Sequence, residues 1–356
     1  MRRTATYSII LLLLSVSAQS CRQNLEDIDN YDISSIFEHV DIASDSLQSI
    51  SFGISFCDYV VWANNVDAGP LLTVYNTKSS LIKKCFMRGR GPGEGLGILN
   101  MGVCPTDSST FYVYDMSDRL LTFSIDRYDT VRLNAESLHD AYWTVMLSNG
   151  FVYSPYDGDM RYAAYDFEQS RTNYFGHPDV KSLSATLCNS LLQEVPELSP
   201  DGTKLALFSG SGVYYKIYDI SDISSPQIII DKTFIEPKID YDPETYEYFS
   251  TPDDVFGFEI TASDRQYIYA AYQGSTALDY IRAGRDAMMA RKIMVIDWSN
   301  GETVCFINYN NHPIVSIACN DITKMFYLVY QSDNGDNNVV SCNLQNLHDF
   351  LTNEKS

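Results

Sequence analysis

Basic side chains are scarce in this 356-residue sequence, which has 25 Lys and Arg against 46 Asp and Glu and a formal net charge of −21. Nucleic-acid binding depends on clustered Lys and Arg that neutralise phosphates, so this composition argues against a nucleic-acid partner. It also disfavours electrostatic docking on anionic lipid. After the first twenty residues no stretch approaches 18 consecutive apolar residues, so we do not expect the remaining chain to span a membrane.

Residues that hold metals or perform nucleophilic catalysis are also sparse. The five histidines lack the spacing of metal ligands, and the eight cysteines include no C-x-x-C pair. Ser211 lacks the G-x-S-x-G context of a hydrolase, and residues 333–338 lack the length and terminal Glu of a calcium loop. We therefore expect no metal and no cofactor, and the sequence identifies no catalytic residue.

The first twenty residues have the features of an export signal. Arg2 and Arg3 precede an apolar run from Ile9 to Val16, and small or polar residues then lead to Cys21. Residues 17–21, Ser-Ala-Gln-Ser-Cys, resemble a bacterial lipoprotein cleavage site, although Ala at position 18 replaces the usual Leu. The resemblance implies that Cys21 becomes the acylated first residue of an outer-membrane lipoprotein, periplasmic or surface-exposed. Ordinary cleavage that leaves an unmodified cysteine is the alternative. Residues 21–34 then serve as a polar tether.

A polar turn followed by an aromatic-rich apolar strand recurs six times along the chain. The turns lie near residues 58, 107, 149, 201, 264 and 321, and a second strand ending in Asp or Asn follows each turn. Six such units of about 40–55 residues predict an all-β fold, a six-bladed β-propeller of four-stranded antiparallel blades. We expect the propeller to span residues 35–346, with residues 36–42 supplying the outer strand of the last blade. Residues 347–356 are expected to be a polar tail.

Three features together resemble the TolB-like six-bladed propeller lipoproteins of Gram-negative bacteria. They are the lipoprotein leader, the Ser-Pro-Asp-Gly turn at 199–202, and the Gly-Arg-Gly-Pro-Gly-Glu segment at 89–94. The resemblance covers about residues 35–346 and implies an anchored, exported propeller. It supplies no catalytic residue, because members of this group mostly lack an assigned activity.

The long connections between strands provide the candidate binding residues. Two insertions interrupt the fifth repeat, at 235–254 and 274–291, and propeller topology places both on the same face as segment 89–94. That glycine-rich segment is interpreted as a tight turn between blades, with an anion site as the alternative. The residues expected to contact a ligand are Arg88, Arg90, Glu94, Tyr241, Tyr246, Tyr248, Asp254 and His312.

These features favour a non-catalytic, lipid-anchored module that binds or scaffolds an unknown protein, peptide or glycan. Aromatic faces serve sugar and protein contacts alike, so the ligand class stays open. The alternative is a lyase or hydrolase at the mouth of the propeller channel, which would need convergent acid, base or metal-binding side chains there. We expect the tyrosines of the first insertion to lie on the surface, so that replacing Tyr246 and Tyr248 by alanine leaves stability nearly unchanged.

Overall fold

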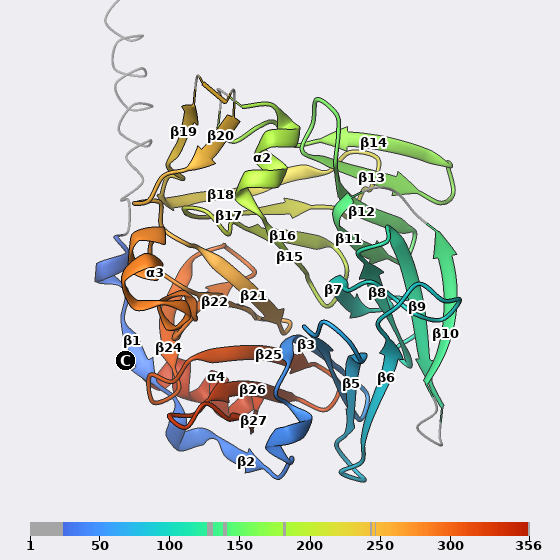
Figure 1. Ribbon diagram of the computed structural model, residues 1–356, viewed down its shortest axis with the longest axis vertical. Coiled ribbons are helices and arrows are strands. Elements are labelled where there is room, and N and C mark those ends of the chain that lie inside the picture. Colours follow the sequence, from blue (N-terminus) through green and yellow to red (C-terminus); the bar gives the residue numbers. More distant parts are fainter. Residues whose placement is uncertain are drawn as a thin grey trace, which may run out of the picture.

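Six sheets, each built on four antiparallel strands, surround a central axis in the computed structural model of the chain (Figure 1). The structure describes residues 24–126, 131–137, 141–180, 183–242, 244–245 and 247–354. The predicted six-bladed, all-β propeller is therefore confirmed. Cys21, Tyr246 and the export signal lie outside the described residues.

Each blade uses four strands, named A to D from the axis outward. The first three blades are β3 (Ile50–Phe56), β4 (Tyr59–Asn64), β5 (Pro70–Asn76) and β6 (Ile82–Met87); β7 (Ile98–Val103), β8 (Thr110–Asp115), β9 (Arg119–Ile125) and β10 (Val131–Ser137); and β11 (Ala141–Leu147), β12 (Gly150–Pro155), β13 (Tyr162–Asp166) and β14 (Arg171–Phe175). The last three are β15 (Val195–Leu198), β16 (Lys204–Phe208), β17 (Val213–Asp219) and β18 (Gln227–Ile235); β21 (Phe258–Ser263), β22 (Tyr267–Tyr272), β23 (Lys292–Asp297) and β24 (Thr303–Asn308); and β25 (Ile314–Asn320), β26 (Met325–Gln331), β27 (Asn337–Asn343) and β2 (Glu38–Val40).

The B and C strands form the core, because a neighbouring blade covers each face of a blade. All six residues of β12 are buried, which explains why these strands are continuous apolar and aromatic runs. Aromatic rings pack between adjacent blades. The ring centroids of Phe56 in blade 1 and Phe111 in blade 2 are 5.5 Å apart, and Phe111 stacks on Phe123 with a centroid distance of 5.1 Å. All seven cysteines from Cys57 onward are free thiols, and four of them are buried.

The N-terminal strands close the ring. Strand β2 pairs antiparallel with β27, with Glu38 opposite Ser341 and Val40 opposite Val339, as predicted for residues 36–42. Strand β1 (Asn30–Asp32) adds in parallel to β24 on blade 5, and the fully buried Ile33 follows it. Three short 3-10 helices accompany these strands: η1 (Leu25–Asp27), η2 (Ser34–Ile36) and η3 (Ser44–Ser46). Residues 24–34, expected to be part of a polar tether, therefore pack on the propeller, because apolar residues alternate with the acidic ones there.

The C-terminal residues differ from the expected polar tail. They form α4 (Leu344–Asn353). Asn343 caps the N-terminus of this helix, and its side chain accepts a hydrogen bond from the Gln345 backbone N–H. Leu344, Leu347 and Leu351 lie on one face of this helix and are at most 2% exposed. Three leucines at helical spacing thus dock a segment whose remaining residues are mostly polar.

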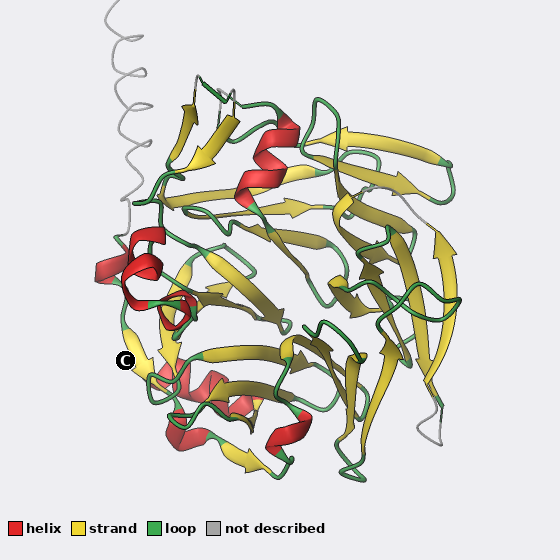
Figure 2. Cartoon of the chain, viewed as in Figure 1, coloured by secondary structure: helices red, strands yellow, loops and turns green. Residues whose placement is uncertain are grey.

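The other helices lie outside the blades, in connections between strands (Figure 2). They are α2 (Ala185–Leu192), which precedes blade 4, and α3 (Ala277–Ala283) with η4 (Arg285–Met288), which lie between β22 and β23. A separate hairpin of β19 (Ile239–Asp242) and β20 (Glu247–Ser250) precedes blade 5. In the part of the chain that the structure describes, no helix combines the length and apolar character needed to cross a membrane.

Candidate functional site

The six A strands surround a cavity of about 940 Å³ along the axis of the propeller. Connections from each D strand to the next A strand reach one face, which we call the D–A face, and the A–B turns lie on the other. The residues that line the cavity near the D–A face, named here the D–A mouth, are Leu99, Asn100, Tyr142, Asn189, Glu194 and Glu259.

The cavity has an acidic lining. Its carboxylates are Glu194, Glu197, Asp201, Glu259 and Asp321, and its described lining residues include no Lys, Arg or His. Serine, threonine and asparagine side chains and apolar groups complete the wall. Such a wall offers hydrogen-bond acceptors to a neutral or cationic ligand and repels an anionic one.

Glu197 has a carboxyl group in this wall that burial perturbs. It lies on β15, and its Oε1 accepts a hydrogen bond of 2.7 Å from the Ser263 hydroxyl on β21 of the next blade. Burial raises the pKa of Glu197 to about 7, because the charged form loses hydration and no cation compensates it. Near neutral pH this group can therefore both donate and accept a hydrogen bond.

Neighbouring blades hold the D–A mouth in shape. The Asn100 side chain on β7 donates to the Thr144 carbonyl at 2.7 Å and accepts from the Thr144 N–H at 3.1 Å, which joins blades 2 and 3. Tyr142 is half-buried and packs edge-on against Tyr156, with ring centroids 4.7 Å apart. An aromatic side chain with a supported ring therefore borders the cavity.

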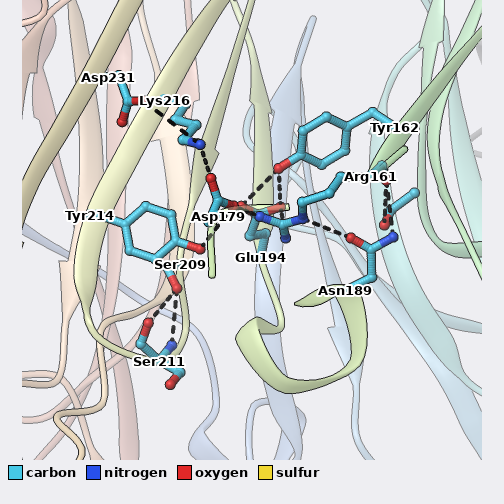
Figure 3. Close-up of polar contacts among 11 residues, drawn as sticks. Arg161, Tyr162, Asp179, Asn189, Glu194, Ser209, Ser211, Tyr214, Lys216 and Asp231 are labelled. Carbon is cyan, nitrogen blue, oxygen red and sulfur yellow. Dashed lines mark hydrogen bonds and ion pairs between the residues drawn. The ribbon is translucent and has the colours of Figure 1, made fainter. Parts of the chain in front are cut away.

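A buried ionic network lies behind the cavity lining between blades 3 and 4, and its Asn189 and Glu194 line the cavity (Figure 3). Its centre is Arg161, which immediately precedes β13 and is completely buried. Its Nη2 lies 2.8 Å from Glu194 Oε2, its Nε donates to Asn189 Oδ1 at 2.9 Å, and its Nη1 pairs with Asp179. The Tyr162 hydroxyl lies 2.7 and 2.9 Å from the two oxygens of Glu194. Although burial opposes the charge, the Glu194 carboxylate raises the pKa of Arg161 above its ordinary value.

The same network reaches a second cavity of about 640 Å³ on the outer side of blades 3 and 4. Asp179 and Lys216 line this outer cavity and pair with each other, whereas Asn189 and Glu194 line the central one. Lys216 also lies 3.9 Å from Asp231. Each charge of the network faces an opposite charge. The network therefore joins the connection that contains α2 to blades 3 and 4.

The glycine-rich segment 89–94 is a tight turn, and its candidate residue Glu94 is bound inside it. The Glu94 carboxylate accepts from the Gly91 N–H at 2.8 Å, and a Cβ at Gly89 or Gly91 would collide with that carboxylate. Arg88 donates from Nη1 to the Val66 carbonyl at 2.7 Å, while Arg90 is exposed. Glu94 thus binds within its own turn, whereas Arg88 binds the loop between β4 and β5.

Asp254 and His312 also have structural partners. Asp254 is 1% exposed, accepts from the Lys238 N–H at 2.9 Å and from the Ser211 hydroxyl, and so joins the base of the hairpin to blade 4. His312 is half-buried and stacks on Tyr330, with ring centroids 5.1 Å apart.

The hairpin tyrosines lie above α2. Tyr241 and Tyr248 are cross-strand neighbours with ring centroids 4.9 Å apart. Tyr241 is 41% exposed, but Tyr248 is half-buried and packs on a cluster that includes Leu183 and Leu192. Tyr248 is therefore not the simple surface residue that the sequence analysis expected.

The structure brings the two fifth-blade insertions together but keeps them away from the cavity. The Phe256 N–H donates to the Ser275 carbonyl at 2.8 Å and the Leu278 N–H to the Pro252 carbonyl at 2.9 Å. Segment 89–94 contacts blade 2 instead, where Arg119 donates to the Glu94 carbonyl at 2.6 Å. None of the seven described candidate residues lines the central cavity.

Sequence reasoning missed the residues of the cavity wall. A signal was present in Glu197 and Glu259, which are acidic residues within the short apolar strands that open blades 4 and 5. Over the described ranges, no group of three or more His, Cys, Asp or Glu is placed to hold a metal ion.

Comparison with known proteins supports the fold. The sequence matches no known protein family. It also matches no curated protein. The structure is similar to the crystal structure of a Bacteroides fragilis protein that is assigned as exported, with a TM-score of 0.58 and 10% sequence identity over 88% of this chain and 97% of that one. At this identity the similarity shows a shared propeller fold alone.

Proposed function

We propose that this protein is an exported, lipid-anchored propeller that binds a peptide or glycan in its central cavity without chemical turnover. The supporting observation is the cavity of about 940 Å³, with its five carboxylates and no described cationic side chain in its lining. A peptide or oligosaccharide chain can enter such a space, whereas a folded protein partner can contact only its rim.

The chemistry of the wall fits these ligands. Sugar hydroxyls and peptide N–H groups are hydrogen-bond donors, and the carboxylates of the wall are acceptors. Tyr142 offers an aromatic surface at the mouth, a type of side chain that contacts sugars and peptides alike. The acidic lining disfavours phosphorylated or otherwise anionic ligands.

Export and anchoring are part of the same proposal. They rest on the leader and on Cys21, and the fold similarity to an exported protein agrees with them. An outer-membrane location follows from the lipoprotein pattern.

Calorimetric titration tests the binding function. The mature protein is titrated with a panel of neutral oligosaccharides and a panel of short peptides that contain Lys or Arg. We expect saturable binding of at least one probe, weakened about tenfold or more by Tyr142→Ala and by Glu197→Gln, because each variant removes a contact in the cavity. Tyr174→Ala is the matched control, since Tyr174 is 58% exposed on the outer strand β14. Binding that ignores both cavity variants, or that Tyr174→Ala weakens equally, would refute the proposal.

One observation favours a hydrolase or lyase as the second candidate. A carboxyl group whose pKa is about 7, as burial makes that of Glu197, can act as a general acid or base near neutral pH. Product analysis of the bound probe separates the two functions. Cleavage by the wild type that Glu197→Gln abolishes would replace the binding function with catalysis.

A further inference from the structure

Helix α3 leaves all of its side chains outside the protein core. Its N-terminus is firmly fixed, because Thr276 and Asp279 form a reciprocal capping box and the Leu278 N–H bonds to the Pro252 carbonyl at 2.9 Å. Nevertheless, none of its residues is buried. The fold therefore holds this helix in place without using it for packing.

The exposed side chains of α3 are largely apolar. Leu278 is 36% exposed, Tyr280 46% and Ile281 72%, and Ile281 is the most exposed large apolar side chain in the described part of the chain. Leu278 and Ile281 are three residues apart, so they lie on the same face of the helix. A cluster of this kind on an ordered helix marks a surface that another apolar phase covers.

The position of the N-terminal residues indicates which apolar phase covers α3. Cys21 lies three residues before Asn24, the first described residue, and three extended residues span at most about 11 Å. Leu25 and Ile28 pack in one cluster with Val255 and Tyr272. Val255 also pairs with Thr276, the cap of α3.

The first described residues and α3 consequently lie at the same rim of the ring, where Figure 1 shows those residues, in blue, next to α3. A lipid on Cys21 would bring the bilayer to this rim, because the chain between the lipid and the propeller is so short.

We propose that α3 enters the interface of the lipid bilayer beside the acylated Cys21 and thereby fixes how the propeller stands on the membrane. This inference rests on the lipid anchor of the proposed function. Leu278 and Ile281 would reach the acyl boundary, while Tyr280 and the exposed Arg282 would lie among the headgroups. The net charge of −21 excludes electrostatic attraction to anionic lipid as the driving force. The contact is therefore apolar and insensitive to salt.

Tryptophan fluorescence provides the test, because Trp62, Trp143 and Trp298 are at most 5% exposed. The lipidated Ile281→Trp variant is reconstituted on phosphatidylcholine vesicles with and without brominated acyl chains. We expect a blue shift of the added emission and its quenching by the brominated lipid. Ile322→Trp is the matched control, since Ile322 is 64% exposed in the A–B turn of blade 6 on the opposite face, and it should not be quenched. Adding Leu278→Asp to Ile281→Trp should reduce the quenching.

The outcomes separate this inference from the anchor on which it rests. The anchor is measured by itself, as membrane partition of the wild type that Cys21→Ala abolishes. Vesicle-bound Ile281→Trp without quenching would overturn the role of α3 while the anchor stands. Equal quenching of the Ile281 and Ile322 variants would indicate non-specific adsorption and would also overturn it. Shielding of α3 by an envelope protein, without quenching by lipid, would assign the helix to a protein partner instead.

Discussion

At the scale of single residues, the Glu197 carboxyl shows how an interior wall changes an ordinary side chain. Its partner is a neutral hydroxyl, that of Ser263, and no cation offsets the loss of water. Arg161 is the contrasting case, because its buried charge faces two carboxylates and an amide oxygen. Burial therefore disfavours the charged form of Glu197 but not that of Arg161, because Arg161 has partners of opposite charge and Glu197 has a neutral hydroxyl.

This contrast predicts how stability depends on pH. The pKa of Glu197 is about 7 in the folded protein and near its ordinary value of 4.5 in the unfolded chain. Its contribution to stability is complete below about pH 4.5, because the native state binds the proton more tightly. The contribution is lost as the pH rises to about 7. Glu197→Gln should therefore raise the free energy of unfolding at pH 8, by up to about 3 kcal/mol, and change it little at pH 4.

Urea denaturation at the two pH values measures this effect. Glu168→Gln serves as the control. Because Glu168 is exposed, its replacement should change the free energy of unfolding equally at both pH values. A Glu197→Gln variant with the same change in stability at pH 4 and pH 8 would contradict the prediction.

Single-residue roles were only partly predictable from the sequence. The tight turn at 89–94 was predicted from its local glycines, although Gly89, Gly91 and Gly93 have no positive φ, and Gly89 and Gly91 instead leave room for the Glu94 carboxylate. The ionic network was not, because Asp179, Asn189 and Glu194 come from one long connection while Arg161 and Lys216 come from different blades. Nothing local in the sequence shows that these segments meet.

At the scale of elements, the hairpin of β19 and β20 has two tyrosines with different environments. Tyr248 packs above α2 on the Leu183 cluster, and Tyr241 projects to solvent. Their sequence context is similar, and only the docking of the hairpin on α2 distinguishes them. Short elements with mixed composition, such as α4, were missed for a related reason, since three leucines among polar residues signal a helix only when a surface receives them.

Alanine substitution should reveal this difference between the tyrosines. We expect Tyr248→Ala to lower the free energy of unfolding by about 1–3 kcal/mol, roughly half the usual cost for a fully buried aromatic residue, because it removes half-buried contacts. Tyr241→Ala should cost less than about 0.5 kcal/mol, the range of ordinary surface substitutions. Thermal melts of both variants give the comparison, and equal losses would show that the hairpin does not rest on α2 as described.

At the scale of the whole molecule, the repeat spacing alone predicted six blades and the use of an N-terminal strand in the last one. Both are long-range features, yet a repeated unit that cannot bury its faces alone must stack in a closed ring. The position of the cavity residues did not follow, because repeat spacing defines blades without ordering the side chains along their inner edges.

Ring closure predicts a strong dependence on the N-terminal segment. Deleting residues 22–42 removes β1, β2 and the buried Ile28, Ile33 and Ile42. Each buried isoleucine contributes about 2–5 kcal/mol, so the three together account for about 6–15 kcal/mol, as much as the usual margin of about 5–15 kcal/mol for a domain. The variant should show no cooperative thermal transition, and a peptide of residues 24–42 added in trans should restore one. A cooperative melt of the deletion variant without peptide would contradict this account.

The pairing of N-terminal strands with C-terminal strands determines when the fold can be completed during synthesis. Residues 30–40 are synthesised before their strand partners at 306–308 and 339–341. Until β24 and β27 are made, β1 and β2 have no strand partners, and exposed strand edges invite pairing with other chains. A chain halted before β24 and β27 are made would therefore be a substrate for chaperones and proteases. The ring can close only when both segments are present, so completion of the fold reports that the chain has been made through β27.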